Sequence, residues 1–163
     1  MFSSAISPPP DTTDKKTLYP EIHRVLQAVL TGESDRIANL ANAAALLFWN
    51  LPAVNWAGFY LLKERELVLG PFQGKIACVR IKLGQGVCGN AAEQRQTLVV
   101  PNVHEFPGHI ACDSASNSEI VVPIVKNDAL IGILDIDSPE FARFDDNDKT
   151  GLEEFVRILT AVL

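Results

Sequence analysis

Two apolar runs joined by a short polar turn constrain the fold of this chain more than any other feature. Residues 120–125 and 130–136 have the length and composition of buried strands, and Asn127-Asp128 between them is a favourable hairpin turn. Strands linked by a hairpin pair antiparallel, so the chain is expected to form a mostly antiparallel sheet. Because helical patterns precede and follow these strands, we predict an α+β fold with helices packed on the sheet.

The other periodic segments predict the helices and the remaining strands. Apolar residues recur at helical spacing over 18–29 and 37–48; Ser34 can cap the second segment and Pro52 stops it. Asp145 can cap a closing helix. Further strands are expected over 55–62, 66–69, 75–81 and 97–100, and a short helix over 87–95. Residues 101–117 show no period, which predicts a long loop of the kind that is usually functional.

Length and charge exclude several classes of protein. The 163 residues fit one domain, and a net charge of −6 argues against binding to nucleic acids or to anionic membranes. No apolar run approaches the roughly 18 residues that span a bilayer. Residues 1–13 are rich in Ser, Pro and Thr and contain no Lys or Arg, which is unlike a secretory or transit signal. We therefore expect a disordered tail over 1–13, one domain over 14–163 and a cytoplasmic location.

The three cysteines are the first candidates for chemistry, because an odd number is a poor disulfide framework. Cys112 lies in the long loop among polar residues, where it is either a reactive thiol or a loop cysteine tucked under the sheet. Cys88 follows a glycine-rich turn at a helix start, which would lower its thiol pKa; alternatively it is simply a small residue in a crowded place. Cys78 lies on a predicted strand and by itself would be a buried small hydrophobic residue.

Two carboxylates end the second strand of the hairpin. Strand alternation places Asp135 and Asp137 on one face together with Ile131 and Ile133. Carboxylates on such a face are costly to bury unless they meet a partner. They therefore form either an acidic site for a cationic ligand or a group beyond the sheet edge in water.

The position of Glu119 relative to these aspartates depends on the hairpin loop. A two-residue turn is expected to pair Glu119 with Ile136, on the wrong face for Asp135, whereas a three-residue loop is expected to pair it with Asp135. A β-bulge would also correct the register. The sequence leaves these alternatives open.

Aromatic residues Trp56 and Tyr60 share one face of a predicted strand. They are either ordinary core residues or an aromatic wall for a methyl-sulfur group or a cation.

Two weaker patterns carry no function. His104, His109, Cys112 and Asp113 do not have a common zinc spacing, so no metal is expected and the histidines are interpreted as solvated loop residues. Gly84, Gly86 and Gly89 spell G-x-G-x-x-G, but the βαβ unit that a dinucleotide site requires is missing.

Several segments together resemble one family. NWAGFYLL, LGPFQGKIACVRI, GVCG, HIACDSASNSEIVVP and GILDIDSP are similar to segments of the free methionine-(R)-sulfoxide reductases, single-domain proteins of the GAF fold. The resemblance spans about residues 14–163 in order and without large gaps. It is specific, because general GAF sensory domains do not carry this set of three cysteines.

The resemblance implies a role for each candidate residue. Cys112 corresponds to the attacking nucleophile, Cys78 to the resolving cysteine, and Cys88 to an additional thiol that is a second candidate for resolution. Glu119, Asp135 and Asp137 match acidic pocket residues, with Glu119 as proton donor supported by Asp137. Trp56 and Tyr60 match an aromatic wall, so the substrate-binding set is Trp56, Tyr60, Glu119, Asp135 and Asp137.

The resemblance also implies a reaction and its partners. Free L-methionine (R)-S-oxide would be reduced to L-methionine through a cysteine sulfenic acid and an intramolecular disulfide. Thioredoxin, which receives its electrons from NADPH, would restore the thiols. The resemblance implies no bound cofactor, and it implies a homodimer. The alternatives are a ligand-binding GAF sensory domain and a thiol redox sensor without sulfoxide turnover.

Overall fold

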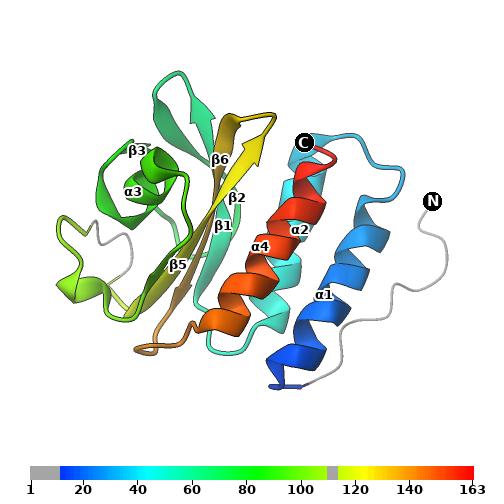
Figure 1. Ribbon diagram of the computed structural model, residues 1–163, viewed down its shortest axis with the longest axis horizontal. Coiled ribbons are helices and arrows are strands. Elements are labelled where there is room, and N and C mark those ends of the chain that lie inside the picture. Colours follow the sequence, from blue (N-terminus) through cyan, green and yellow to red (C-terminus); the bar gives the residue numbers. More distant parts are fainter. Residues whose placement is uncertain (1–11, 110–113) are drawn as a thin grey trace.

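An antiparallel sheet forms the centre of the protein (Figure 1). The computed structural model describes residues 12–109 and 114–163, so Cys112 and most of the predicted tail lie outside the described residues. Within them, six strands follow the order β3-β2-β1-β6-β5-β4, and every neighbouring pair is antiparallel. The strands are β1 Trp56–Lys63, β2 Glu66–Gly74, β3 Arg80–Lys82, β4 Leu98–Val100, β5 Ser118–Lys126 and β6 Ala129–Ser138. The predicted antiparallel α+β architecture is confirmed.

Helices cover both faces of this sheet, but unequally. Helices α1 Lys15–Leu30, α2 Arg36–Asn50 and α4 Asp146–Thr160 lie on one face, and α3 Gly86–Gln94 lies on the other (Figure 1). A 3-10 turn, Val103–Glu105, interrupts the long loop. No helix in the part of the chain that the structure describes has the length and apolarity needed to cross a membrane.

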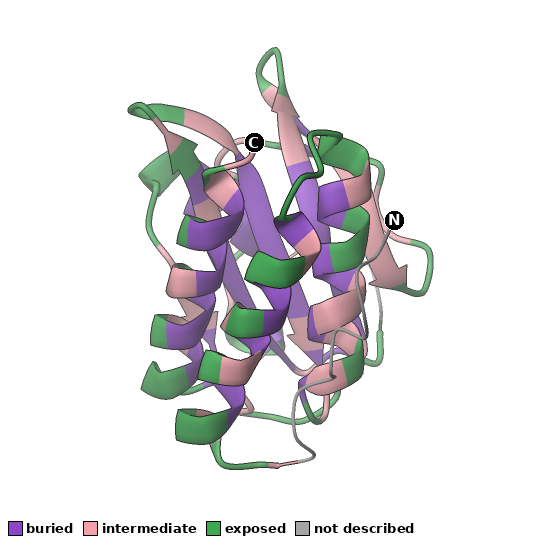
Figure 2. Ribbon diagram, turned by 90° about the vertical axis from the view of Figure 1, so that its right-hand side faces the viewer, coloured by how far each residue is buried: buried purple, intermediate pink, exposed green. Residues whose placement is uncertain are grey.

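The sheet separates two apolar clusters. The larger cluster lies between the sheet and α1, α2 and α4, whose inner sides are buried and outer sides exposed (Figure 2). The smaller cluster lies on the α3 side and includes Trp56, Tyr60, Cys88, Val121 and Ile133. Strand alternation sends Phe59 and Leu134 into the larger cluster and their neighbours Tyr60 and Ile133 into the smaller one. Stability therefore rests mainly on the three-helix side, and polar residues enter the smaller side.

Helix caps explain where two of the helices begin. Asp145 caps α4, and its side chain and that of Asp148 form a reciprocal capping box, as the sequence predicted for Asp145. Helix α2 begins one residue later than expected, because Asp35 rather than Ser34 is the cap. Its carboxylate accepts the backbone N–H of Ala38 at 2.8 Å.

The β5–β6 hairpin resolves the open question of register. Asn127 and Asp128 form a two-residue turn and both have positive φ, 51° and 62°, as the favoured hairpin turn requires. Val125 pairs with Leu130 but Ile124 pairs with Gly132, so Ile131 is an extra residue, a β-bulge. The bulge places Glu119 opposite Asp137, not opposite Ile136 or Asp135. It also turns Ile131 to the three-helix side, so the prediction that Ile131 shares the aspartates' face was wrong.

Residues 75–79 are a loop, and β3 begins only at Arg80. The prediction of a strand over 75–81, with Cys78 on it, was therefore wrong for most of its length. The apolar residues of this segment misled the prediction, since Ile76 and Val79 are exposed, at 91% and 63%, and do not enter a core.

Candidate active site

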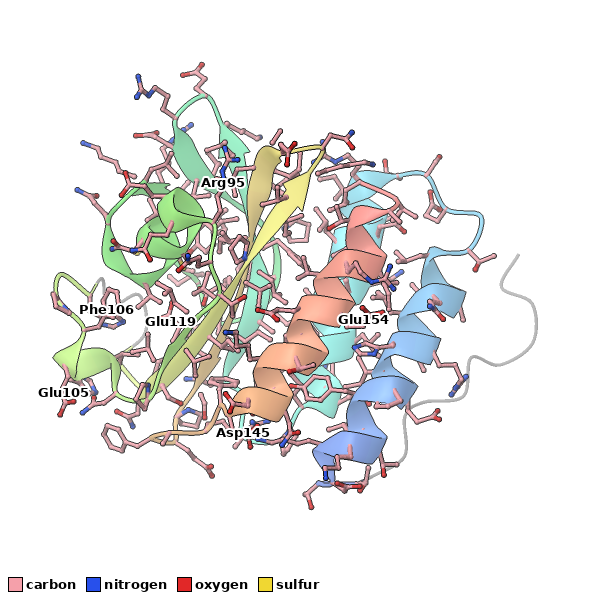
Figure 3. The ribbon with its side chains drawn as sticks, viewed as in Figure 1. Arg95, Glu105, Phe106, Glu119, Asp145 and Glu154 are labelled. Carbon is pink, nitrogen blue, oxygen red and sulfur yellow. The ribbon has the colours of Figure 1, made fainter. Side chains whose placement is uncertain are left out.

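A pocket lies on the α3 side of the sheet, between the strands and the turn that leads into α3. It holds about 530 Å³ of space, counting the solvent at its mouth. Figure 3 shows Glu119 on this side of the sheet, facing the segment that carries Phe106. The lining brings together most of the residues singled out from the sequence: Trp56, Tyr60, Cys88, Glu119, Asp135 and Asp137.

Three carboxylates meet on the floor of this pocket. Asp137 pairs with Glu119 across the β5–β6 ladder, and Asp135 lies two residues before Asp137 on the same face. Glu119 and Asp135 are buried, at 5% and 6% exposure. Among the described residues, the buried Oδ1 of Asp135 has no hydrogen-bond partner. An orphaned buried acceptor is costly, and it suits a ligand that brings a donor or a positive charge.

The environment of these acids favours their neutral forms. Burial, and then the nearby charge of Asp137, raises the pKa of Glu119 to about 8. Burial, and then Glu119, raises the pKa of Asp135 well above its usual range. Glu119 is therefore a carboxylic acid that retains its proton at neutral pH and can donate it inside the pocket.

Cys88 belongs to this acidic group. Its Sγ lies 3.6 Å from Glu119 Oε1, and the residue is only 6% exposed. Burial, and then the charges of Asp135 and Glu119, raises the pKa of the Cys88 thiol well above its usual value. The lowered pKa expected from the helix start is thus wrong, because burial beside carboxylates outweighs the helix dipole. Cys88 is a free thiol.

The aromatic pair forms one wall of the pocket. The rings of Trp56 and Tyr60 stack with centroids 6.0 Å apart, and Phe72 stacks behind Trp56 at 5.2 Å. Gly58, between the two on β1, makes this possible, because a Cβ there would lie 2.3 Å from the Cβ of Phe72. The wall is therefore flat and apolar beside the acidic floor.

The polar ends of the two rings hold the loop that carries Cys78. The indole N–H of Trp56 donates to the carbonyl of Lys75 at 3.0 Å, and the Tyr60 hydroxyl donates to the carbonyl of Cys78 at 3.0 Å. Cys78 is half-buried and takes part in a disulfide bond. Loop residues Ile76 and Ala77 line the pocket beside it.

The two histidines of the long loop differ from each other. His104 is exposed and bonds Asn117 Oδ1 at 2.8 Å, as expected of a surface residue. His109 lines the pocket, with its side chain 15% exposed and its Nε2 3.7 Å from Glu119 Oε2. Interpreting His109 as a solvated residue was therefore wrong. The sequence pattern could not predict the position of His109 in the pocket, because residues 101–117 show no periodicity that would relate this loop to a distant strand.

A metal ligand set different from the one considered in the sequence occurs on the floor. Ligand atoms of Cys88, Glu119 and Asp135 lie within 4.8 Å of one another. The raised pKa values mean that protons can balance this buried charge at neutral pH without a metal ion.

Comparison with known proteins identifies relatives along almost the whole chain. The GAF domain family model matches residues 22–163. The chain is 53% identical over 150 residues to the free methionine-R-sulfoxide reductase of Escherichia coli, covering 92% of this chain and 91% of that one.

Solved structures agree with the sequence relatives. The structure of fRMsr of Staphylococcus aureus in complex with substrate has a TM-score of 0.85 and 53% identity, covering 89% of this chain and 95% of that one. Free methionine-R-sulfoxide reductase from Neisseria meningitidis, in complex with its substrate, has a TM-score of 0.91 and 44% identity, covering 99% and 95%.

Proposed function

Because this chain belongs to the GAF-domain family and, within it, to the free methionine-(R)-sulfoxide reductases, we propose that it reduces free L-methionine (R)-S-oxide to L-methionine in this pocket. One observation carries the assignment of the pocket: Glu119, an acid kept protonated to about pH 8, lies in a recess with an aromatic wall. Such a group suits a reaction in which a sulfoxide oxygen must be protonated.

Each part of the substrate has a matching group in the proposal. Asp135, supported by Asp137, takes the ammonium group, which would provide a partner for the orphaned Asp135 Oδ1. Trp56 and Tyr60 contact the sulfur and its methyl group. A recess of this kind would exclude a methionine within a polypeptide, because a peptide bond leaves no free ammonium group to bind.

The proposed chemistry begins with Cys112. Its thiolate attacks the sulfoxide sulfur, Glu119 protonates the oxygen, and methionine leaves while Cys112 becomes a sulfenic acid. The Cys78 thiol then attacks the sulfenic sulfur, which forms a disulfide and releases water. The assignment of Cys78 rather than Cys88 as the resolving residue is supported by the disulfide at Cys78 and by the raised pKa of the free Cys88 thiol.

The reductant and the setting are also part of the proposal. An external dithiol of the thioredoxin type would exchange with the Cys78 disulfide and restore both thiols, with no bound cofactor. We propose a cytoplasmic homodimer; size-exclusion chromatography with light scattering tests the dimer.

The test of the function is thioredoxin-coupled NADPH oxidation with separate R and S epimers of free methionine sulfoxide and with a blocked, peptide-like form. Turnover of the free R epimer alone is expected. A folded enzyme that turns over none of them, with a working coupling system, would instead favour a ligand-sensing GAF domain.

Two cysteine variants test the roles. Cys112→Ser should release no methionine, even in one turnover. Cys78→Ser should release about one methionine per subunit and then stall, because the sulfenic acid forms before resolution. Sustained turnover by Cys78→Ser would transfer the resolving role to Cys88.

A further inference from the structure

His109 is a partly exposed residue that lies beside the buried acid of the pocket. Its Nε2 lies 3.7 Å from Glu119 Oε2, and its side chain is 15% exposed where that of Glu119 is 6% exposed. The other carboxylate oxygen, Oε1, faces the Cys88 thiol at 3.6 Å. Glu119 therefore has one oxygen against a buried thiol and the other against an imidazole that reaches the surface.

The reaction proposed above, on which this inference rests, requires Glu119 to be reloaded once in every cycle. Cys112 loses its proton to solvent when it becomes a thiolate, and Glu119 gives a proton to the sulfoxide oxygen. In the resolving step, the thiol proton of Cys78 and the hydroxyl group of the Cys112 sulfenic acid leave together as water. The proton that Cys112 released must therefore return from solvent to the Glu119 carboxylate before the next turnover.

We propose that His109 is the proton relay that reloads Glu119 from solvent. The imidazolium donates a proton from Nε2 to the carboxylate, which becomes the carboxylic acid, and the neutral ring then takes a proton from water or a buffer acid. An imidazole suits this role because it can accept a proton at one nitrogen and release one from the other. His109 thus acts through Glu119 and is a positioning residue for its proton.

The charges around His109 are consistent with this direction of transfer. Burial lowers the pKa of His109. The resting ring is therefore neutral at pH 7, and its protonated form readily gives up its proton. Glu119 on β5 faces His109, and the other titratable groups that line the same pocket are Asp135 and Asp137 on β6, Cys88 on α3 and Tyr60 on β1. None of these groups is a cation that would compete with the imidazolium.

A burst experiment separates relay from structural support. Reduced enzyme starts with Glu119 protonated, so His109→Ala should release its first methionine at the wild-type rate. Later turnovers, with thioredoxin saturating, should be about tenfold slower or more, since general acid–base groups commonly contribute about 10²–10⁴-fold. Added imidazole should restore the His109→Ala rate and leave wild type unchanged. His104→Ala, at the exposed histidine of the same loop, is the matched control.

Three outcomes would overturn the proposal: an unchanged steady-state rate in His109→Ala, a burst slowed as much as the later turnovers, or a loss that imidazole does not rescue. His109→Gln, which keeps a polar side chain of similar length, replaces the alanine variant if that one does not fold.

A second readout does not depend on turnover and distinguishes failure of the relay from failure of the proposed function. Nitrogen-15 spectra of the His109 ring followed against pH should show a titration that changes when Glu119→Gln removes the neighbouring acid. Identical His109 titrations in wild type and Glu119→Gln would show that the two groups are not coupled, whatever the substrate of the enzyme.

Discussion

Glu119 combines two properties that side chains rarely show together: it is buried, and in the proposed reaction it gives up a proton. Its place at the start of β5, opposite Asp137, provides both, because the strand enters the pocket wall and a second carboxylate discourages ionisation. The family resemblance implied that Glu119 and the two aspartates form a group with Glu119 as proton donor, but their pKa values, which depend on burial, were not predictable from the sequence.

At the residue scale, Glu119→Gln is the most direct test of the acid. The amide keeps the shape but cannot donate an acidic proton, so kcat/KM should fall by about 10²–10⁴-fold. Wild type should lose activity as pH rises through about 8, where Glu119 ionises, and the residual activity of the variant should lack that decline. Glu105→Gln, at an exposed glutamate, is the control. A variant within tenfold of wild type would contradict the assignment of Glu119 as proton donor.

The same pKa shift predicts how stability depends on pH. Glu119 has a folded pKa of about 8 against an ordinary value of 4.5, so between these values the folded state binds more protons than the unfolded state. The contribution of Glu119 to the free energy of unfolding is full below about pH 4.5 and is lost as pH rises through about 8. Urea unfolding of the reduced protein should show lower stability at pH 8 than at pH 6, by about 2 kcal/mol. Glu119→Gln should show a smaller decrease; an equal decrease would assign the pH dependence to other groups.

At the scale of elements, the β-bulge at Ile131 decides whether the acidic residues share a face. The two-residue turn was predictable from Asn127-Asp128, and by itself it would have turned Glu119 away from the aspartates. One extra residue in β6 reverses this. Sequence pattern identified the strands and gave a bulge as one alternative, but it did not place the bulge. Gly132, beside the bulge, packs so closely on β1 that a Cβ there would lie 2.2 Å from the Tyr60 carbonyl oxygen.

The docking of α3 gives a prediction at this scale. A Cβ on Gly89 would lie 2.3 Å from the carbonyl oxygen of Lys82, so Gly89→Ala should push α3 away from β3. Cys88 would move with it, and activity should fall about tenfold or more, since small displacements in active sites are costly. This loss should occur although alanine favours a helix by about 1 kcal/mol. Gln94→Ala, on the exposed side of α3, is the control, and an active Gly89→Ala enzyme would show that α3 need not approach this closely.

At the scale of the whole molecule, one buried carboxylate ties the first helix to the last. Asp148 is fully buried and accepts the Tyr19 hydroxyl at 2.8 Å and Arg143 Nη1 at 3.0 Å, together with the Lys15 ammonium group. The sequence predicted Asp145 as a cap from local spacing. It did not predict Asp148 as a junction, because two of its partners, Lys15 and Tyr19, are 133 and 129 residues away along the chain.

Asp148→Asn should therefore destabilise the fold without altering the chemistry. Removing one member of a buried ionic group typically costs about 3–5 kcal/mol, because the remaining charges lose their partner. Chemical denaturation should show this loss, whereas the kcat/KM of the folded enzyme should stay within about twofold of wild type, since Asp148 lies on the three-helix side of the sheet. Asp146→Asn, exposed in the same turn, is the control. A large fall in the kcat/KM of folded Asp148→Asn would show that the three-helix side of the sheet is coupled to the pocket on the other side.

The two aromatic rings of the pocket wall have an effect beyond contact with a substrate. Their polar ends, Trp56 Nε1 and the Tyr60 hydroxyl, suspend the loop that presents Cys78. A ligand that displaced the Tyr60 ring would therefore also displace the backbone of Cys78, the residue that we propose acts second. In the proposed reaction, the same two hydrogen bonds would couple occupancy of the pocket to the position of the second thiol.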